Sequence, residues 1–165
     1  MKHILFVCTG NTCRSSMAEG LFRSQLEKDP VLSDKLTVES AGVNAFDGDM
    51  ASTNSIKVLN ERFDIDISGH RAKLINKHLV NKADIILTMT AGHRDSLVYN
   101  FPEAKDKTYT IKEFVRLNLK GMNNGGNLDI KDPYGGSKEI YEKCAEEILS
   151  EIRQVLTILK GYFDV

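Results

Sequence analysis

Short apolar runs alternate with longer amphipathic stretches along this chain. Four runs have the length and composition of strands buried on both faces of a parallel sheet: residues 4–7, 36–38, 85–87 and, more weakly, 108–110. Apolar residues at helical spacing predict three helices: residues 15–26, 50–63 and 137–159. This alternation predicts an α/β fold, a three-layer sandwich with a central four-stranded parallel sheet.

Composition restricts the kinds of protein that the chain can be. Its 165 residues are 41% hydrophobic and 27% charged, which is typical of a single domain over residues 1–165. The net charge is -1 and basic residues are spread along the chain, so no nucleic-acid partner is expected. No apolar stretch approaches the roughly 20 residues of a membrane span, and no membrane partner is expected either. Nothing in the sequence indicates an oligomeric state.

The three cysteines and four histidines do not resemble a disulfide framework or a metal site. Cys8 and Cys13 share one short segment, and an odd number of cysteines is typical of a reducing compartment, so we expect a cytoplasmic protein. Cys144 falls on the apolar stripe of the last predicted helix and is expected in the core. No metal-ligand spacing occurs among the histidines, and three of them are interpreted as structural: His3, His78 and His93.

The segment VCTGNTCRSS, residues 7–16, connects the first predicted strand to the first predicted helix. It begins at the carboxyl end of a strand, where parallel α/β sheets bind their ligands. The amides of residues 9–14 can curl around an anion, aided by the positive end of the helix. We expect Gly10 to supply backbone angles closed to other residues and Asn11 to adopt the left-handed region. Residues 8–14, here called the anion loop, therefore predict a strand–loop–helix phosphate-binding site.

Three side chains of this segment suit nucleophilic attack on a bound phosphoryl group. The planar guanidinium of Arg14 can grip two phosphoryl oxygens. The same cation, the amides and the helix end favour the thiolate form of Cys8, and the Ser15 hydroxyl can donate to that sulfur. Alone, a cysteine at a strand end is usually a small core residue, and an arginine at a helix start is usually solvated. Their spacing across a glycine-containing loop favours the catalytic interpretation.

The motif VCTGNTCRS resembles the signature of the low-molecular-weight protein tyrosine phosphatases. The resemblance continues in the family's order through four further segments: ESAGV (39–43), SGHRAKLI (68–75), ADIILTMT (83–90) and KDPYGGS (131–137). It implies a cysteine-dependent protein phosphatase that acts on phosphorylated proteins through a phosphocysteine intermediate, with no metal or organic cofactor. Residues that it implies in phosphate or substrate binding are Thr9, Gly10, Asn11, Thr12, Cys13, Ser15 and Tyr134.

The resemblance also assigns roles outside the anion loop. It makes Asp132, the aspartate of the Asp-Pro pair, the general acid, a role that suits a carboxyl group kept protonated beside a thiolate and a phosphate. Asp129, the nearest competitor, lacks the proline. Tyr134 would form an aromatic wall of the cleft, the alternative being a partly buried loop tyrosine. Two further residues would join Asn11 in holding the loop by hydrogen bonds: Ser40 and His70.

Two positions of the loop bear on regulation and substrate. Cys13 lies five residues after Cys8, close enough to act as a redox partner when Cys8 is oxidised, although it could instead be a small packing residue. Thr12 stands where tyrosine-specific members of the family commonly have a bulky aliphatic residue. A threonine at this position makes the loop resemble that of the bacterial protein arginine phosphatase branch. Phosphoarginine is therefore slightly favoured over phosphotyrosine.

Two departures from the family pattern and two other function classes remain. Ser16 replaces the usual proline after Arg-Ser and is expected to cap the helix, and the Gly/Asn-rich loop at 118–127 is long.

Thiol-dependent arsenate reductases share the fold and loop but need further cysteines, and residues 83–110 contain none. A non-catalytic phosphoprotein-binding module would have no use for both Cys8 and Asp132.

Overall fold

The structure, a computed structural model of the chain, describes residues 1–119 and 126–163. Its centre is a parallel sheet in the order β2-β1-β3-β4. The strands are β1 (Lys2–Cys8), β2 (Leu36–Gly42), β3 (Ile85–Thr88) and β4 (Thr108–Thr110). All four predicted runs are strands, and the four-stranded parallel α/β prediction is confirmed.

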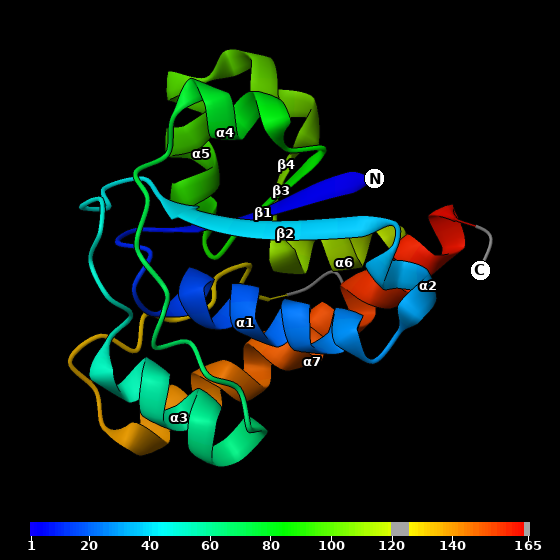
Figure 1. Ribbon diagram of the computed structural model, residues 1–165. Helices are drawn as coiled ribbons and strands as arrows, with labels where there is room; N and C mark the ends of the chain where they lie inside the picture. The colour runs from blue at the N-terminus through cyan, green and yellow to red at the C-terminus, as the bar shows by residue number, and fades with distance from the viewer. Residues whose placement is uncertain (120–125, 164–165) are drawn as a thin grey trace.

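Helices cover both faces of the sheet (Figure 1). One layer contains α1 (Arg14–Glu27), α3 (Thr53–Phe63), α6 (Ile111–Asn118) and α7 (Lys138–Tyr162). The opposite layer contains α4 (Lys77–Lys82) and α5 (Ala91–Asn100), followed by the short 3-10 helix η1 (Pro102–Lys107). The one-turn helix α2 (Pro30–Ser33) connects α1 to β2.

Strand β1 shows why the apolar runs are uninterrupted. Ile4 and Phe6 belong to the hydrophobic cluster under α1 and α7, whereas Leu5 and Val7 belong to the cluster under α4 and α5. Successive side chains of a strand point to opposite faces, so a strand covered on both sides must be apolar throughout. Burying each such side chain contributes about 1.5–3 kcal/mol.

Polar caps determine where the helices begin. The helix predicted over 50–63 begins later, because Ser52 Oγ accepts a hydrogen bond from the Ser55 amide at 3.3 Å and the chain before it is extended. Ser137 caps α7 in the same way. Four helices that the sequence pattern did not identify are short and also begin after polar caps, namely α2 after Asp29, α4 after Asn76, α5 after Thr90 and α6 after Thr110.

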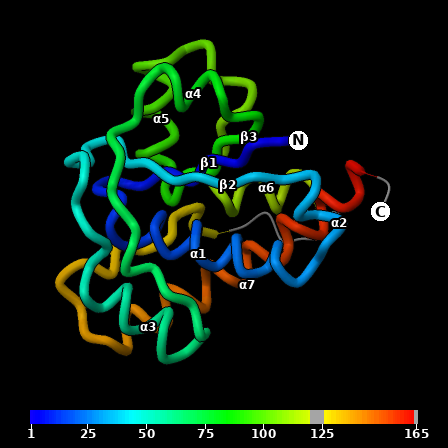
Figure 2. Tube along the Cα trace, in the orientation of Figure 1, coloured from blue at the N-terminus to red at the C-terminus, as the bar shows by residue number. Residues whose placement is uncertain are grey.

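The order of the strands positions the anion loop. β1 lies between β2 and β3, and the trace in Figure 2 runs from its carboxyl end through the loop directly into α1. In open α/β sheets this end of the central strands is where ligands bind. Most of the long loop predicted at 118–127 lies outside the described residues. No helix of the described chain combines the length and apolarity needed to cross a bilayer.

Candidate active site

The backbone of the anion loop differs from the sequence expectation at one position. Asn11 has φ 58°, the left-handed conformation expected of it. Gly10 does not have a positive φ, so the expectation that it supplies such angles is wrong. A Cβ at Gly10 would lie 3.7 Å from Thr12 Oγ1, in ordinary contact. Asn11 therefore makes the turn by itself.

The end of β2 packs against the anion loop so closely that only glycine fits at Gly42. A Cβ there would overlap the Thr9 carbonyl oxygen and lie 2.9 Å from the Asn11 nitrogen. Backbone hydrogen bonds of 2.9 Å from Val43 to the Cys8 carbonyl and from Asn44 to the Thr9 carbonyl join the two segments. The path of the loop is thus held by β2 as well as by β1 and α1.

The thiol of Cys8 is surrounded by hydrogen-bond donors. The Asn11 amide donates to Cys8 Sγ at 3.3 Å, and Ser15 Oγ lies 2.8 Å from the same sulfur. Ser15 Oγ itself accepts a hydrogen bond of 2.8 Å from Asn11 Nδ2, and its own proton can go to the sulfur or to the Ala41 carbonyl, 3.4 Å away. Donors of this kind stabilise a thiolate.

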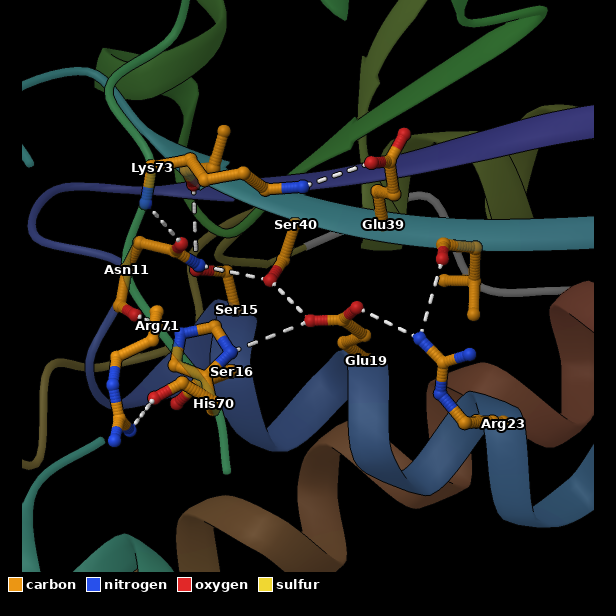
Figure 3. A network of polar contacts seen from close by, with 12 residues as sticks. Asn11, Ser15, Ser16, Glu19, Arg23, Glu39, Ser40, His70, Arg71 and Lys73 are labelled. Carbon is orange, nitrogen blue, oxygen red and sulfur yellow. Dashed lines mark hydrogen bonds and ion pairs between the residues drawn. The ribbon is translucent and has the colours of Figure 1, made fainter. Parts of the chain in front are cut away.

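The side chain of Asn11 ties the loop to segments distant in sequence (Figure 3). Its Nδ2 also donates to Ser40 Oγ at 2.9 Å, and its Oδ1 accepts from the Lys73 amide at 3.0 Å. The Asn11 carbonyl accepts from His70 Nε2 at 2.7 Å. The two residues that the resemblance placed around Asn11, Ser40 and His70, both contact it.

Glu19 completes this network, and sequence reasoning missed it. Its Oε2 accepts a hydrogen bond of 2.7 Å from Ser40 Oγ and lies 3.5 Å from His70 Nδ1 (Figure 3). Burial raises the pKa of Glu19, but hydrogen bonds from His70 and Ser40 outweigh it and bring the pKa below its usual value. The signal available in the sequence was its position one helical turn after Ser15 on α1.

Arg14 is buried at the start of α1 and faces the general-acid candidate. Its Nη1 donates to the Ile130 carbonyl at 3.0 Å, and its Nη2 lies 3.6 Å from Asp132 Oδ2. Among the described residues, Arg14 Nε has no hydrogen-bond partner. Asp132 Oδ1 accepts from the Tyr134 amide at 3.1 Å, the Asx turn that Asp-Pro-Tyr favours. By contrast, Asp129 accepts from the Ala91 amide at the start of α5.

A cavity of about 230 Å³ brings most of the candidate residues together. Its lining residues are Cys8, Thr9, Gly10, Thr12, Cys13, Arg14, Asp132 and Tyr134. Tyr134 stands on the rim, 79% exposed. Three other candidates do not line the cavity and are buried: Asn11, Ser15 and Ser40.

The remaining cysteines have different surroundings. Cys13 Sγ lies 3.4 Å from Ser52 Oγ and 3.3 Å from the Tyr141 hydroxyl, and burial raises the pKa of Tyr141 to about 12. Its role as redox partner of Cys8 stays a prediction. Cys144 is buried in the core, as predicted, and burial raises its pKa to about 12.

One sequence interpretation changes at the edge of the loop, and one residue interpreted as structural contacts the loop there. Ser16 does not cap α1, because it lies within the helix and its hydroxyl donates to the Cys13 carbonyl at 2.9 Å. His93, interpreted as structural, contacts the anion loop, with Nε2 2.8 Å from Thr9 Oγ1. That contact joins residues 84 positions apart, which no local motif indicates.

Comparison with known proteins agrees with this geometry. The model of the family described as low molecular weight phosphotyrosine protein phosphatase matches residues 3–162. A protein-arginine-phosphatase from Geobacillus stearothermophilus is 42% identical over 145 residues, which are 88% of this chain and 87% of the relative. A solved structure of an arginine phosphatase from that organism has a TM-score of 0.84 at 40% identity, covering 98% of this chain and 95% of the other. The low molecular weight protein tyrosine phosphatase from T. tengcongensis gives 0.82 at 43% identity, covering 95% and 99%.

Proposed function

Because this chain belongs to the low molecular weight phosphotyrosine protein phosphatase family, we propose that it is a cysteine-dependent phosphatase that removes phosphoryl groups from arginine side chains of proteins. The observation behind the proposal is the grouping of a thiol, a guanidinium and a carboxyl around one cavity. Cys8, Arg14 and Asp132 border it together, and Arg14 lies 3.6 Å from Asp132. A nucleophile, an oxyanion clamp and a general acid are the three parts that phosphoryl transfer to a thiol needs.

In the first step, the Cys8 thiolate attacks phosphorus. A sulfur–phosphorus bond forms while the phosphorus–nitrogen bond to the arginine side chain breaks. Asp132 acts as the general acid and gives a proton to the leaving nitrogen. The loop amides and Arg14 hold the phosphoryl oxygens as their charge redistributes.

In the second step, water attacks the phosphocysteine. The sulfur–phosphorus bond breaks and its electron pair returns to Cys8 as the thiolate, held by Ser15 and the Asn11 amide. Asp132 takes the proton from the attacking water and is ready for the next cycle. Inorganic phosphate is the second product, and no metal or organic cofactor is required.

The preference for phosphoarginine rests on Thr12 and on the named relatives. Thr12 is half-buried in the cavity wall, where its hydroxyl suits a polar guanidino group better than an aromatic ring. The relative from Geobacillus stearothermophilus and the solved structure from the same organism are both called arginine phosphatases. The relative from T. tengcongensis is called a tyrosine phosphatase, so phosphotyrosine is the alternative substrate.

Turnover of phosphoarginine and phosphotyrosine peptides by the wild type and Thr12→Ile tests this preference. We expect the wild type to favour phosphoarginine, and the bulky aliphatic side chain of Thr12→Ile to shift the ratio of kcat/KM toward phosphotyrosine by about tenfold or more. Thr12→Val is the matched control, because it removes the hydroxyl and adds little bulk. A wild type that ignores phosphoarginine would show the preference to be wrong.

Cys8→Ser separates catalysis from binding. We expect turnover to disappear, whereas a variant as fast as the wild type would favour a phosphoprotein-binding module. Arsenate-dependent oxidation of thioredoxin would favour an arsenate reductase. That reaction needs a further accessible cysteine, whereas Cys144 is buried, with its sulfur 3.8 Å from the Lys131 carbonyl.

The three free thiols are typical of a reducing compartment, so we also propose a cytoplasmic location and phosphorylated proteins as partners.

A further inference from the structure

His93 lies directly behind the exposed edge of the anion loop. It is the third residue of α5, is 7% exposed, and is held at its amide by Thr90 Oγ1, the cap of the helix, at 3.1 Å. Its Nε2 lies 2.8 Å from the hydroxyl of Thr9, the residue that follows the nucleophile. Thr9 is exposed and borders the cavity. A buried ring thus contacts a hydroxyl that substrate can reach.

The surroundings of the ring determine which atom donates. His93 Nδ1 is buried and has no hydrogen-bond partner in the described part of the chain. A proton on Nδ1 would therefore be a buried, unpaired N–H, whereas a proton on Nε2 is satisfied by Thr9. Burial and the nearby Arg14 lower the pKa of His93 to about 4, although Asp129 and Asp132 act in the opposite direction. We assign a neutral ring that donates from Nε2 to Thr9 Oγ1.

This hydrogen bond leaves Thr9 free to recognise a ligand. A hydroxyl oxygen has two lone pairs, and His93 occupies one of them. The backbone of Thr9 is held as well, because its carbonyl accepts from the Asn44 amide at 2.9 Å. The second lone pair is therefore available at a fixed place in the cavity wall.

We propose that Thr9 accepts a hydrogen bond from the guanidino group of a phosphoarginine substrate and that His93 is the positioning residue that orients it. The inference rests on the proposed function, since it assigns substrate recognition in the same cavity. A guanidino group presents several N–H donors in a plane, and a phosphotyrosine ring presents none. The pair would therefore raise the rate on phosphoarginine more than the rate on phosphotyrosine.

Steady-state kinetics on both peptides tests the assignment. Thr9→Val keeps the shape of the side chain and removes the acceptor. We expect it to lower the phosphoarginine to phosphotyrosine ratio of kcat/KM by about tenfold. Thr9→Ser, which keeps the hydroxyl, is expected to retain most of the ratio. For the positioning residue, His93→Met is expected to lower the ratio severalfold, and His93→Gln, whose amide N–H can replace Nε2–H, to restore it.

The outcomes distinguish recognition from a structural contact. If Thr9→Val lowers both activities equally while the wild type still hydrolyses phosphoarginine, the pair only fastens α5 to the loop, and the inference is overturned. A wild type active on phosphotyrosine alone would overturn the proposed substrate, and the inference with it. Thr9 is exposed, so its variants give an answer even if the buried His93 variants do not fold.

Discussion

At Asn11, one buried amide side chain holds three separate segments of the chain together. It contacts Ser15 on α1, Ser40 on β2 and the Lys73 amide, while the Asn11 backbone turns through positive φ to place its amide on the nucleophile. Left-handed backbone costs most residues about 1–2 kcal/mol. Because every polar group of the Asn11 side chain is satisfied, the surroundings offset that cost and keep the loop formed without substrate.

Glu19 supports this arrangement because it contacts the residues that hold Asn11, and replacing Glu19 tests that support. Glu19→Gln loses the charge that faces His70 Nδ1, 3.5 Å away, in a mostly buried position. We expect the free energy of unfolding to fall by about 1–3 kcal/mol and kcat to fall with it. Urea unfolding and peptide turnover measure the two effects.

Arg23→Gln is the control, because Arg23 pairs with the other oxygen of Glu19 at 2.9 Å from a side chain that is 56% exposed. An exposed ion pair contributes only about 0–1 kcal/mol. Equal losses in the two variants would contradict a role for Glu19 in holding the anion loop.

The end of β2 acts on the site through its shape. Gly42 lies where the strand leaves the sheet beside the loop, and the Thr9 carbonyl and Asn11 amide occupy the space of a side chain. Two parallel strands therefore determine the loop: β1 supplies the nucleophile at its end, and β2 sets how far the loop can curl.

Gly42→Ala tests this dependence. The added methyl group must displace the loop backbone, so we expect a loss of about 1–3 kcal/mol of stability and a larger proportional loss of kcat, since the amides that hold the phosphoryl group move. Gly69→Ala is the matched control, because a Cβ there has no atom within 4 Å and its φ is not positive. Full activity of Gly42→Ala, with its stability unchanged, would show that the close approach does not matter.

Across the whole molecule, sequence reasoning succeeded where the signal is local. The apolar run before Cys8 and the cap-and-stripe pattern of α7 lie within short windows, so periodicity identifies them. The short helices α4, α5 and α6 offer too few turns for such a pattern. Glu19 was missed, and the contact of His93 with Thr9 was not predicted, because the partners of both residues are brought near only by the fold, His93 and Thr9 being 84 residues apart.

Glu39 joins three parts of the molecule through its charge. This residue of β2 accepts from Lys73 Nζ at 2.9 Å, in the connection to α4, and from Lys82 Nζ at 2.7 Å, at the end of α4. Burial raises the pKa of Glu39, but the hydrogen bonds from Lys82 and Lys73 outweigh it and lower the pKa to about 2. The folded protein therefore holds Glu39 ionised at pH values where the unfolded chain is protonated.

The sign of the resulting pH dependence follows from linkage. A carboxyl whose pKa falls from 4.5 to about 2 on folding contributes stability that is fully present above pH 4.5 and is lost as the pH falls toward 2. We expect Glu39→Gln to lower the free energy of unfolding at pH 6 and to flatten its decline between pH 4.5 and 2, as measured by urea unfolding at several pH values. Glu27→Gln, at an exposed position at the end of α1, is the control and should show the same decline of the free energy of unfolding with falling pH as the wild type. If the Glu39→Gln slope equals the wild-type slope, the lysine contacts do not stabilise the fold.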